Sequence, residues 1–405
     1  MINIAVLGYG TVGSGVVEVI NTNHDIVNAK ATEEINIKYV LDLREFPGSP
    51  IENILVHDFD TILNDESVKI VVEVMGGVEP AYTFVKKSLL AGKSVCTSNK
   101  ELVAKHGPEL LAIAREKNIN FLFEASVGGG IPIIRPLNSS LTADDILEIT
   151  GILNGTTNFI LTKMTEEGWD FDEALKTAQE LGYAERNPEA DIEGYDACRK
   201  IAILSSLAFG KNVDFEKIYT EGISKITSMD VAYAKKMKRV IKLLASSKKE
   251  DGGYYAMVAP FMVGESNPLH SVNGVFNAIF VKGNVLDDVM FYGSGAGKLP
   301  TASAVVSDVV DAAKHSGTTI HIHWEPEELE LTSMDDAVFA YFVRVKGKKS
   351  QMLKQVEGAF GAAVEVIELD GAPDEFAIVT DYTSEKMFKE RAAKLDCILS
   401  TIRMK

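Results

Sequence analysis

The chain has 405 residues, enough for two or three domains with sizeable cores. Its formal net charge of −17 argues against nucleic acid or an anionic membrane as a main partner, because both attract basic patches, and no apolar stretch is long enough to span a bilayer. The three cysteines are odd in number and far apart, which argues against a disulfide framework. Since no signal-peptide pattern precedes the first apolar run, we expect a cytoplasmic protein.

The chain opens with an apolar run typical of a β-strand, Ile2–Leu7, which leads directly into the glycine turn GYGTVG. In such a turn Gly8 permits the tight bend, Gly10 lets the backbone approach phosphates, and Gly13 lets the following helix pack close to the strand. The N-terminus of that helix offers free N–H groups and partial positive charge to an anion. This order of strand, turn and helix predicts a dinucleotide-binding site; a plain strand-to-helix turn is the alternative.

Strands and helices alternate up to about residue 123, which predicts a parallel sheet with helices on both faces. The expected strands are 35–41, 68–74, 94–97 and 119–123, and the expected helices are 81–91 and 101–116. We therefore expect a doubly wound α/β domain over residues 1–130. A helix at 301–314 is expected to return to this domain and complete it within about 298–325.

The rest of the chain predicts two further units. Residues 131–297 combine helices with strands that fit an antiparallel layer, which indicates an α+β domain. Its expected strands are 146–153, 254–263, 276–281 and 284–292, and its expected helices are 158–165, 171–181 and 195–209. Residues 335–405 follow the order strand, helix, strand, strand, helix, strand, which is the ferredoxin-like plan.

Segment 182–200 gathers several acids just before a helix that is almost entirely apolar. Asp196 and Lys200 are four residues apart, so they share one face of that helix. A helix that is apolar all round is usually buried, and a buried lysine beside carboxylates has a tunable pKa that suits a proton donor. A structural ion pair explains the same spacing equally well.

Residues 96–100 follow an expected strand and precede a helix, at the edge of a parallel sheet where ligands bind. The helix dipole disfavours the charge of Lys100 at this place, which indicates another partner such as a carbonyl, a carboxylate or a cofactor; a surface lysine is the alternative. Cys96 could act as a nucleophile, but without a nearby histidine it more simply ends a buried strand. His321 and His323 would share one face of a strand, and they lack further ligands at metal-binding spacing.

Seven segments resemble motifs of the homoserine dehydrogenases, in the monofunctional form that has no aspartate kinase domain ahead of it. They are GYGTVG (8–13), EVMGG (73–77), TSNKELVA (97–104), EASVGGGIPII (124–134), GILNGTTNFIL (151–161), GYAERNPEADIEGYDACRK (182–200) and GSGAGKLPTASAVVSD (293–308). The resemblance covers nearly the whole chain, and the nineteen-residue run is its most specific part.

The resemblance implies NAD(P)H-dependent, reversible reduction of L-aspartate 4-semialdehyde to L-homoserine in threonine, methionine and isoleucine biosynthesis. It also implies a Rossmann domain, a substrate domain that makes the dimer, and an ACT-like C-terminal domain with a regulatory or assembly role. We therefore expect a homodimer or homotetramer that acts on a small-molecule substrate.

The resemblance further implies roles for individual residues. Lys200 matches the general acid/base that protonates the aldehyde oxygen, and Lys100 matches a second lysine between cofactor and substrate. Glu185 and Asp196 match carboxylates that hold the substrate, and Asp191 lies in the same acidic stretch. Cofactor contacts are implied for Gly8, Gly10, Thr11, Val12, Gly13, Gly76, Ser98, Lys100, Gly182, Glu185 and Gly297, and Asp42 is added to them because of its position at a strand end. A sodium ion is implied at the backbone carbonyls of Glu124, Val127, Gly129 and Ile131.

Two segments depart from the family pattern. After the second strand the family often has Arg-Asp, whereas this chain has Val-Leu-Asp-Leu-Arg at 40–44. Asp42 at the strand end could bind a ribose 2′-hydroxyl, which favours NAD, while Arg44 could accept NADP. In the C-terminal unit, the turn at 345–350 lacks the acidic residue and Pro-Gly of the usual ligand loop. Feedback by threonine and a purely assembling role therefore both stay open.

Two other functions are compatible with parts of the chain. A semialdehyde dehydrogenase would use Cys96 as a thioester-forming nucleophile. An amino-acid-sensing protein would use the nucleotide domain only to hold a ligand. The nearly complete motifs at 97–100 and 182–200 argue against the second alternative.

Overall fold

The computed structural model describes residues 1–250 and 253–405, and its first six strands form one parallel sheet. In sequence order they are β1 (Ile2–Leu7), β2 (Ile35–Leu41), β3 (Leu55–Val56), β4 (Val68–Glu73), β5 (Ser94–Thr97) and β6 (Phe121–Leu122), and in space they follow the order β3-β2-β1-β4-β5-β6. In β1, Val6 lies opposite Val40 on one side and Val72 on the other, and all three are fully buried. This order confirms the predicted doubly wound Rossmann architecture.

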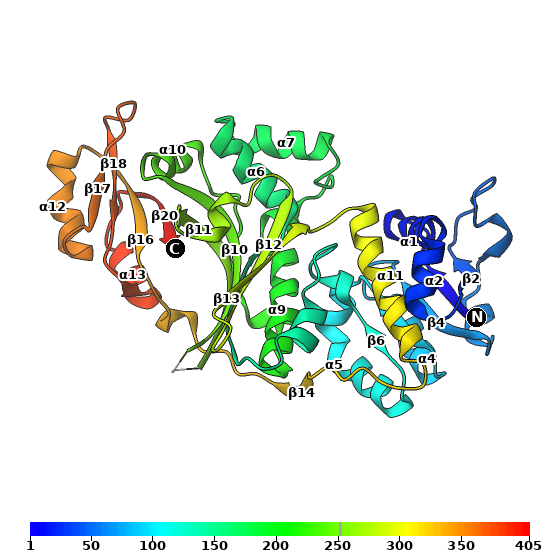
Figure 1. Cartoon of the computed structure of the whole chain (residues 1–405). Coiled ribbons are helices and arrows are strands. Elements are labelled where there is room, and N and C mark those ends of the chain that lie inside the picture. The colour runs from blue at the N-terminus through cyan, green and yellow to red at the C-terminus, as the bar shows by residue number, and fades with distance from the viewer. Residues whose placement is uncertain (251–252) are drawn as a thin grey trace.

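Helices from two parts of the chain accompany this sheet. They are α1 (Thr11–Thr22), α2 (His24–Ala31), α3 (Phe59–Leu63), α4 (Ala81–Leu90), α5 (Lys100–Lys117) and, from much later in the chain, α11 (Lys298–Lys314). Helix α11 packs against α1 and α2 (Figure 1). Gly15 allows this close approach, because a Cβ there would lie 2.7 Å from the carbonyl oxygen of Lys298.

A second, mixed sheet fills the middle and the C-terminal end of the molecule. Its main path runs β13-β12-β7-β10-β11-β20-β16-β18-β17, and β9 (Tyr219–Thr220) pairs with β11. Its strands are β7 (Ile146–Ile152), β10 (Arg239–Glu250), β11 (Gly253–Gly264), β12 (Phe276–Gly283), β13 (Asp288–Ser294), β16 (Tyr341–Lys346), β17 (Glu365–Ile367), β18 (Glu375–Val379) and β20 (Ile398–Met404).

The other helices accompany this sheet, and four short strands pair outside it. The helices are α6 (Gly155–Glu166), α7 (Phe171–Glu180), α8 (Glu189–Ile192), α9 (Tyr195–Phe209), α10 (Ser228–Lys236), α12 (Lys349–Phe360) and α13 (Glu385–Ala392). The short strands are β8 (Lys211–Asn212), β14 (Glu325–Glu328), β15 (Val338–Phe339) and β19 (Thr383–Ser384). Helices α6, α9 and α10 pack against the long strand β10.

The C-terminal unit has the predicted ferredoxin-like plan, with spatial strand order β20-β16-β18-β17 and helices α12 and α13. Its edge strand β20 also pairs in parallel with β11, where Phe261 lies opposite Arg403. The sheet therefore continues from the central part into the C-terminal unit, as Figure 1 shows. The sequence pattern did not predict this pairing.

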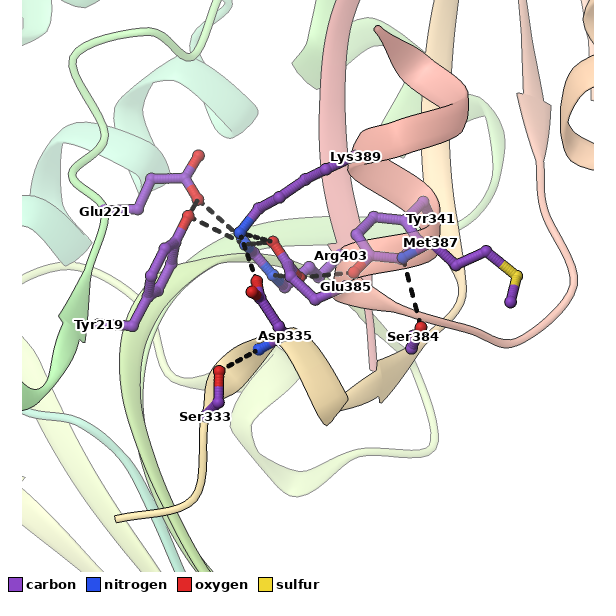
Figure 2. Close-up of polar contacts among 10 residues, drawn as sticks. All are labelled: Tyr219, Glu221, Ser333, Asp335, Tyr341, Ser384, Glu385, Met387, Lys389 and Arg403. Carbon is purple, nitrogen blue, oxygen red and sulfur yellow. Dashed lines mark hydrogen bonds and ion pairs between the residues drawn. The ribbon is translucent and has the colours of Figure 1, made fainter.

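Side chains reinforce the same junction, which is drawn in Figure 2. The Arg403 guanidinium donates to both carboxylate oxygens of Glu385, at 3.0 and 2.6 Å, and to a carboxylate oxygen of Glu221 at 2.7 Å. The phenol of Tyr341 also donates to Glu385. Burial raises the pKa of Glu385, but its bonds from Arg403 and Tyr341 outweigh this and hold the pKa below its usual value.

Several elements differ from the sequence expectations, and three of these differences have a clear physical reason. Strand β10 was not predicted, because polar residues such as Lys242 interrupt its apolar pattern and are buried only in the folded chain. The strand expected at 284–292 begins at Asp288, because the preceding residues form a hairpin turn. The strand expected around His321 and His323 is wrong, since this segment is tied down by Asn120, whose amide group donates to the carbonyl of Thr318 and accepts from the N–H of Ile320.

Over the described ranges, 1–250 and 253–405, no helix combines the length and the apolar character that crossing a membrane requires.

Candidate active site

A cavity of about 710 Å³ is lined by residues from both the Rossmann domain and the central part of the chain. It brings together eleven of the residues singled out from the sequence: Val12, Ser98, Lys100, Val127, Gly129, Gly182, Glu185, Asp191, Asp196, Lys200 and Gly297. These residues come from segments up to 285 positions apart (297 − 12), so only the fold makes them neighbours. The cavity is therefore the candidate active site.

Two lysines share one buried carboxylate at this site. Gly194, whose φ of 84° suits glycine, directly precedes helix α9, which carries Asp196 in its first turn. Asp196 Oδ2 lies 2.8 Å from Lys200 Nζ, one turn along the helix, and its Oδ1 lies 3.0 Å from Lys100 Nζ. Burial raises the pKa of Asp196, but the charges of Lys200 and Lys100 outweigh this and hold the pKa well below its usual value.

Lys200 is fixed by two acceptors. Its ammonium donates to Asp196 and, at 2.9 Å, to the main-chain carbonyl of Leu153, the residue that follows β7. Only 11% of its side chain is exposed. An ammonium has three N–H donors, so one donor stays available toward the cavity.

Lys100 lies at a helix start, where the sequence indicated another partner, and this partner is the carboxylate of Asp196. Asn99 caps helix α5 by accepting from the N–H of Leu102, which sets Lys100 on the first turn. The charge of Asp196 raises the pKa of Lys100, and this effect exceeds the opposing effect of burial. Lys100 is thus a charged group held between the two domains.

Asn154 is a site residue that the sequence reasoning missed. It caps helix α6, where it accepts from the N–H of Thr157, and its amide nitrogen donates to Asp191 at 2.7 Å and to Asp196 at 2.9 Å. Its position before Gly-Thr-Thr is a helix-cap signature that could have drawn attention to it. Asn154 holds the two carboxylates at a fixed separation.

The remaining carboxylates line the same cavity in different ways. Burial raises the pKa of Asp191, and the nearby charge of Asp196 adds to the effect. Glu185 lies on an exposed loop, and within the described residues its carboxylate has no hydrogen bond or ion pair to the other site residues. The structure therefore brings Asp191 to the lysine–aspartate group and leaves Glu185 at the rim.

The glycine turn has the geometry that a pyrophosphate requires. Gly8 has φ of 97°, and a Cβ on Gly13 would lie 1.9 Å from the carbonyl oxygen of Gly8, so neither position tolerates a side chain. Gly10 differs, because among the described residues, apart from Gly10 itself and its neighbours in the chain, no atom lies within 4 Å of where its Cβ would be. Helix α1, which starts at Thr11, has no side-chain cap and no acidic residue in its first turn. These features fit an anion over Gly10 and the helix N-terminus.

The other predicted cofactor residues lie near this turn or at the cavity. Gly76 follows β4 with φ of 81° and open space around it, and Gly297 caps α11 with φ of 120°. Asp42 follows β2 and accepts from the N–H of Tyr9 at 2.8 Å, which connects the end of that strand to the glycine turn.

Cys96 does not belong to the site. It is fully buried within β5 and does not line the cavity, and burial raises the pKa of its thiol well above the usual value. A neutral, buried thiol is a poor nucleophile. This burial agrees with the prediction that Cys96 ends a buried strand.

The buried carboxylate of Glu124 anchors the segment at which a sodium ion is expected. Glu124 accepts from the N–H groups of Ile133, Ile134 and Arg135 at 2.6 to 2.8 Å. Within the described part of the chain, no protein donor reaches the carbonyl oxygens of Val127, Gly129 or Ile131. Among these same described residues, no group of three or more His, Cys, Asp or Glu side chains is placed to hold a metal ion.

Two family models match consecutive parts of the chain: "Homoserine dehydrogenase, NAD binding domain" over residues 8–124 and "Homoserine dehydrogenase" over residues 132–310. A homoserine dehydrogenase of Neisseria gonorrhoeae is 38% identical, with 100% of this chain and 98% of the relative covered. One of Bacillus subtilis is 39% identical, with 96% and 93% covered.

Solved structures agree with these relatives. A homoserine dehydrogenase from Thiobacillus denitrificans superimposes with a TM-score of 0.92 at 35% identity, covering 100% of this chain and 98% of that one. A hyperthermophilic archaeal homoserine dehydrogenase in complex with NADPH gives a TM-score of 0.65 at 30% identity over 77% of this chain and 97% of that one. The chain belongs to the homoserine dehydrogenases, a family of NAD(P)-dependent oxidoreductases.

Proposed function

We propose that this chain interconverts L-aspartate 4-semialdehyde and L-homoserine at the cavity described above, with Lys200 as the proton donor. The observation that carries the proposal is the contact of two lysines from different parts of the fold with one buried carboxylate, Asp196. The bound nicotinamide supplies the hydride. The residues of the chain must then supply a proton, hold the substrate and keep bulk water away.

Lys200 is suited to hand a proton to the oxygen that the reduction makes basic. Two of its donors are engaged by Leu153 and Asp196, which fixes the direction of the third. Asp196 accepts a hydrogen bond from the ammonium of Lys200 and also contacts Lys100, which connects Lys200 to the Rossmann side of the cavity. Lys100 is proposed as the second catalytic residue, a fixed positive charge that stabilises negative charge developing on the same oxygen.

The acidic residues are proposed to hold the amino group of the substrate. Burial without a full cationic partner raises the pKa of Asp191, so a substrate ammonium beside it would stabilise its ionised form. Glu185 on the rim is placed to join it when substrate binds. An amino acid is therefore the class of substrate that satisfies the acids of this cavity.

Two ligands follow from the same reasoning. The dinucleotide, NAD or NADP, is proposed to contact Gly8, Gly10, Thr11, Val12, Gly13, Asp42, Gly76, Ser98, Lys100, Gly182, Glu185 and Gly297. A sodium ion is proposed at the carbonyls of Glu124, Val127, Gly129 and Ile131, supported by the lack of protein donors to the last three among the described residues. Carbonyl oxygens are the hard ligands that such a cation prefers.

The assembly is proposed to be a homodimer, or a homotetramer built from it. Phe276, Met290 and Tyr292 of the hairpin β12–β13 are 40 to 54% exposed, and the rings of Phe276 and Tyr292 stack at 5.3 Å. Large apolar side chains gathered on a sheet face are typical of an interface. The unit boundaries 1–130 with 298–325, 131–297 and 335–405, and the cytoplasmic location, remain predictions.

The proposed function is tested by mixing the purified chain with L-homoserine and either NAD or NADP. We expect an increase in the absorbance of the reduced nicotinamide with homoserine and none with L-2-aminobutyrate, which lacks the hydroxyl group. Absence of any homoserine-dependent reduction with either cofactor would refute the proposal.

A further inference from the structure

Glu73, the last residue of β4, is a fully buried acid. Its Oε1 accepts from the main-chain N–H of Met75 at 2.8 Å, and its Oε2 accepts from the hydroxyl of Thr97 at 2.6 Å. Met75 in turn packs on the glycine turn, since a Cβ on Gly8 would lie 3.2 Å from its Cα. Among the residues that the structure describes, no cationic side chain pairs with the Glu73 carboxylate, and burial raises its pKa. Burying an acid in this way is costly, and what it provides here is two strong acceptors at the end of one strand.

Two loops leave the sheet beside Glu73. The first loop, residues 74–77, follows β4 and contains Gly76. The second loop, residues 98–99, follows β5 and contains Ser98, which lines the cavity. Both loops lie at the carboxyl ends of parallel strands, where a cofactor binds in a sheet of this kind.

A ring of hydrogen bonds starts at Glu73 and joins these two loops. Thr97 lies opposite Glu73 in the paired strands and, besides donating to it, accepts from the N–H of Asn99 at 2.9 Å. The amide group of Asn99 donates to the carbonyl of Gly77 at 2.6 Å. The ring therefore passes from the buried carboxylate through the second loop and returns to the first loop.

The second loop decides where Lys100 lies. Asn99 Oδ1 accepts from the N–H of Leu102 at 3.1 Å and so caps helix α5, whose first residue is Lys100. From there the ammonium of Lys100 reaches Asp196, in the central part of the chain, at 3.0 Å. Because the same Asn99 belongs to the ring that starts at Glu73, the place of Lys100 depends on this buried carboxylate.

We propose that Glu73 is a positioning residue, whose carboxylate holds the first and second loops together and so sets where the cofactor lies relative to Lys100. The inference rests on the proposed function and its cofactor site. Glu73 itself lies outside the cavity lining, so it acts through the two loops and not on the reacting atoms. A misplacement of about 1 Å at a reacting group costs about 100-fold in rate, which makes such a support important for turnover.

Two variants open the ring without changing the cavity lining, and either of them, once folded, suffices for the test. Thr97→Val removes the hydroxyl and keeps the shape of the side chain, and Glu73→Gln replaces one acceptor oxygen by a donor. We expect the dissociation constants of NAD and NADP, measured by isothermal titration calorimetry, to rise about fivefold or more, because a buried hydrogen bond that supports both loops is lost. In the free protein, the N–H groups of the two loops should exchange hydrogen faster. Thr97→Ser keeps the hydroxyl and should restore the wild-type values.

Turnover supplies a readout that a merely structural role would not move. We expect kcat for homoserine oxidation to fall about tenfold or more. The deuterium isotope effect on kcat, with homoserine deuterated at the carbon that gives up the hydride, should increase because hydride transfer becomes slower. A variant that only contained less folded protein would keep the wild-type isotope effect.

Tyr341→Phe is the matched control, since it also removes a hydroxyl that donates to a buried glutamate, Glu385, but in the C-terminal unit. Folded ring variants with wild-type cofactor affinity and isotope effect would overturn the inference. A loss that Thr97→Ser does not restore, or that Tyr341→Phe shares, would overturn it as well. If the wild-type chain binds a cofactor but does not oxidise homoserine, the proposed function alone is refuted, and weaker binding with faster exchange in the two loops still supports the inference.

Discussion

Replacing Lys200 by methionine tests the proposed proton donor most directly. The substitution removes the ammonium and keeps most of the side-chain length, so the cavity is not greatly enlarged. A general acid contributes about 10²- to 10⁴-fold to a rate, which corresponds to roughly 3–5 kcal/mol of transition-state stabilisation. We therefore expect kcat to fall by about 100-fold or more, with little change in cofactor affinity.

Lys200→Met should also lower the free energy of unfolding, because the substitution removes a buried ion pair. Breaking a buried ion pair costs about 3–5 kcal/mol when the remaining charge is left alone. Asp196 keeps Lys100 at 3.0 Å and its bond from Asn154, so we expect a loss at or below the lower end of that range. Thermal unfolding with and without NADP separates this loss from an effect on binding.

Lys163→Met is the matched control. Lys163 forms an ion pair with Glu167 four residues away, at 3.4 Å, but its side chain is 28% exposed and does not line the cavity. It should keep wild-type turnover in the assay of homoserine-dependent nicotinamide reduction. Turnover of Lys200→Met within tenfold of the wild type would refute the role assigned to Lys200.

Three further predictions use the same assay or unfolding measurements. Cys96→Ala should keep activity within about threefold, because the buried thiol touches no part of the cavity, and loss of turnover in a folded variant would revive the thioester alternative. Gly13→Ala should lose about 1–3 kcal/mol of stability because its Cβ would lie 1.9 Å from the carbonyl oxygen of Gly8. Gly10→Ala should fold normally and bind the cofactor more weakly. Equal unfolding temperatures for the two variants would contradict the difference expected between these glycines. Because folding lowers the pKa of Asp196, its carboxylate stabilises the folded chain above the unfolded pKa of about 4, and this stabilisation is lost as the pH falls toward the folded pKa. The free energy of unfolding of Asp196→Asn should therefore depend less on pH in acid than that of the wild type. Parallel curves for the two chains would argue against the ion pairs.

The sequence predicted the Rossmann domain closely because its strands are short apolar runs that end at glycine or polar residues. Strands β2 and β5 have the predicted bounds for this reason. Strand β10 was not predicted, because Lys242 lies in its middle. That lysine is buried with three acceptors, one of them the carbonyl of Val272, 30 residues away, and burial lowers its pKa to about 8. Local hydropathy cannot reveal a partner supplied by tertiary structure.

From residue spacing alone, the site was predictable only where its residues are close in the chain, and the more distant residues were named through the family resemblance. The spacing of Asp196 and Lys200 indicated a shared helix face, and the structure places both at the cavity. Lys100 contacts the same carboxylate of Asp196, although the two residues are 96 positions apart in the chain. A local sequence pattern cannot predict such a contact. Asn154 was not predicted as a site residue because its sequence context indicates only a helix cap. In the folded chain its amide nitrogen also donates to the carboxylates of Asp191 and Asp196.

The continuous ladder from β11 into β20 limits how the C-terminal unit can transmit a signal. Beside the Phe261–Arg403 pairing, the main chain of Lys405 exchanges hydrogen bonds with Met262 and Gly264, at 2.9 and 3.0 Å. A hinge-like swing of that unit would have to break these bonds together. A small molecule that binds there would therefore act by twisting the shared strands. The twist would reach β10 and then β7, and Leu153, which follows β7, supplies the carbonyl that holds Lys200.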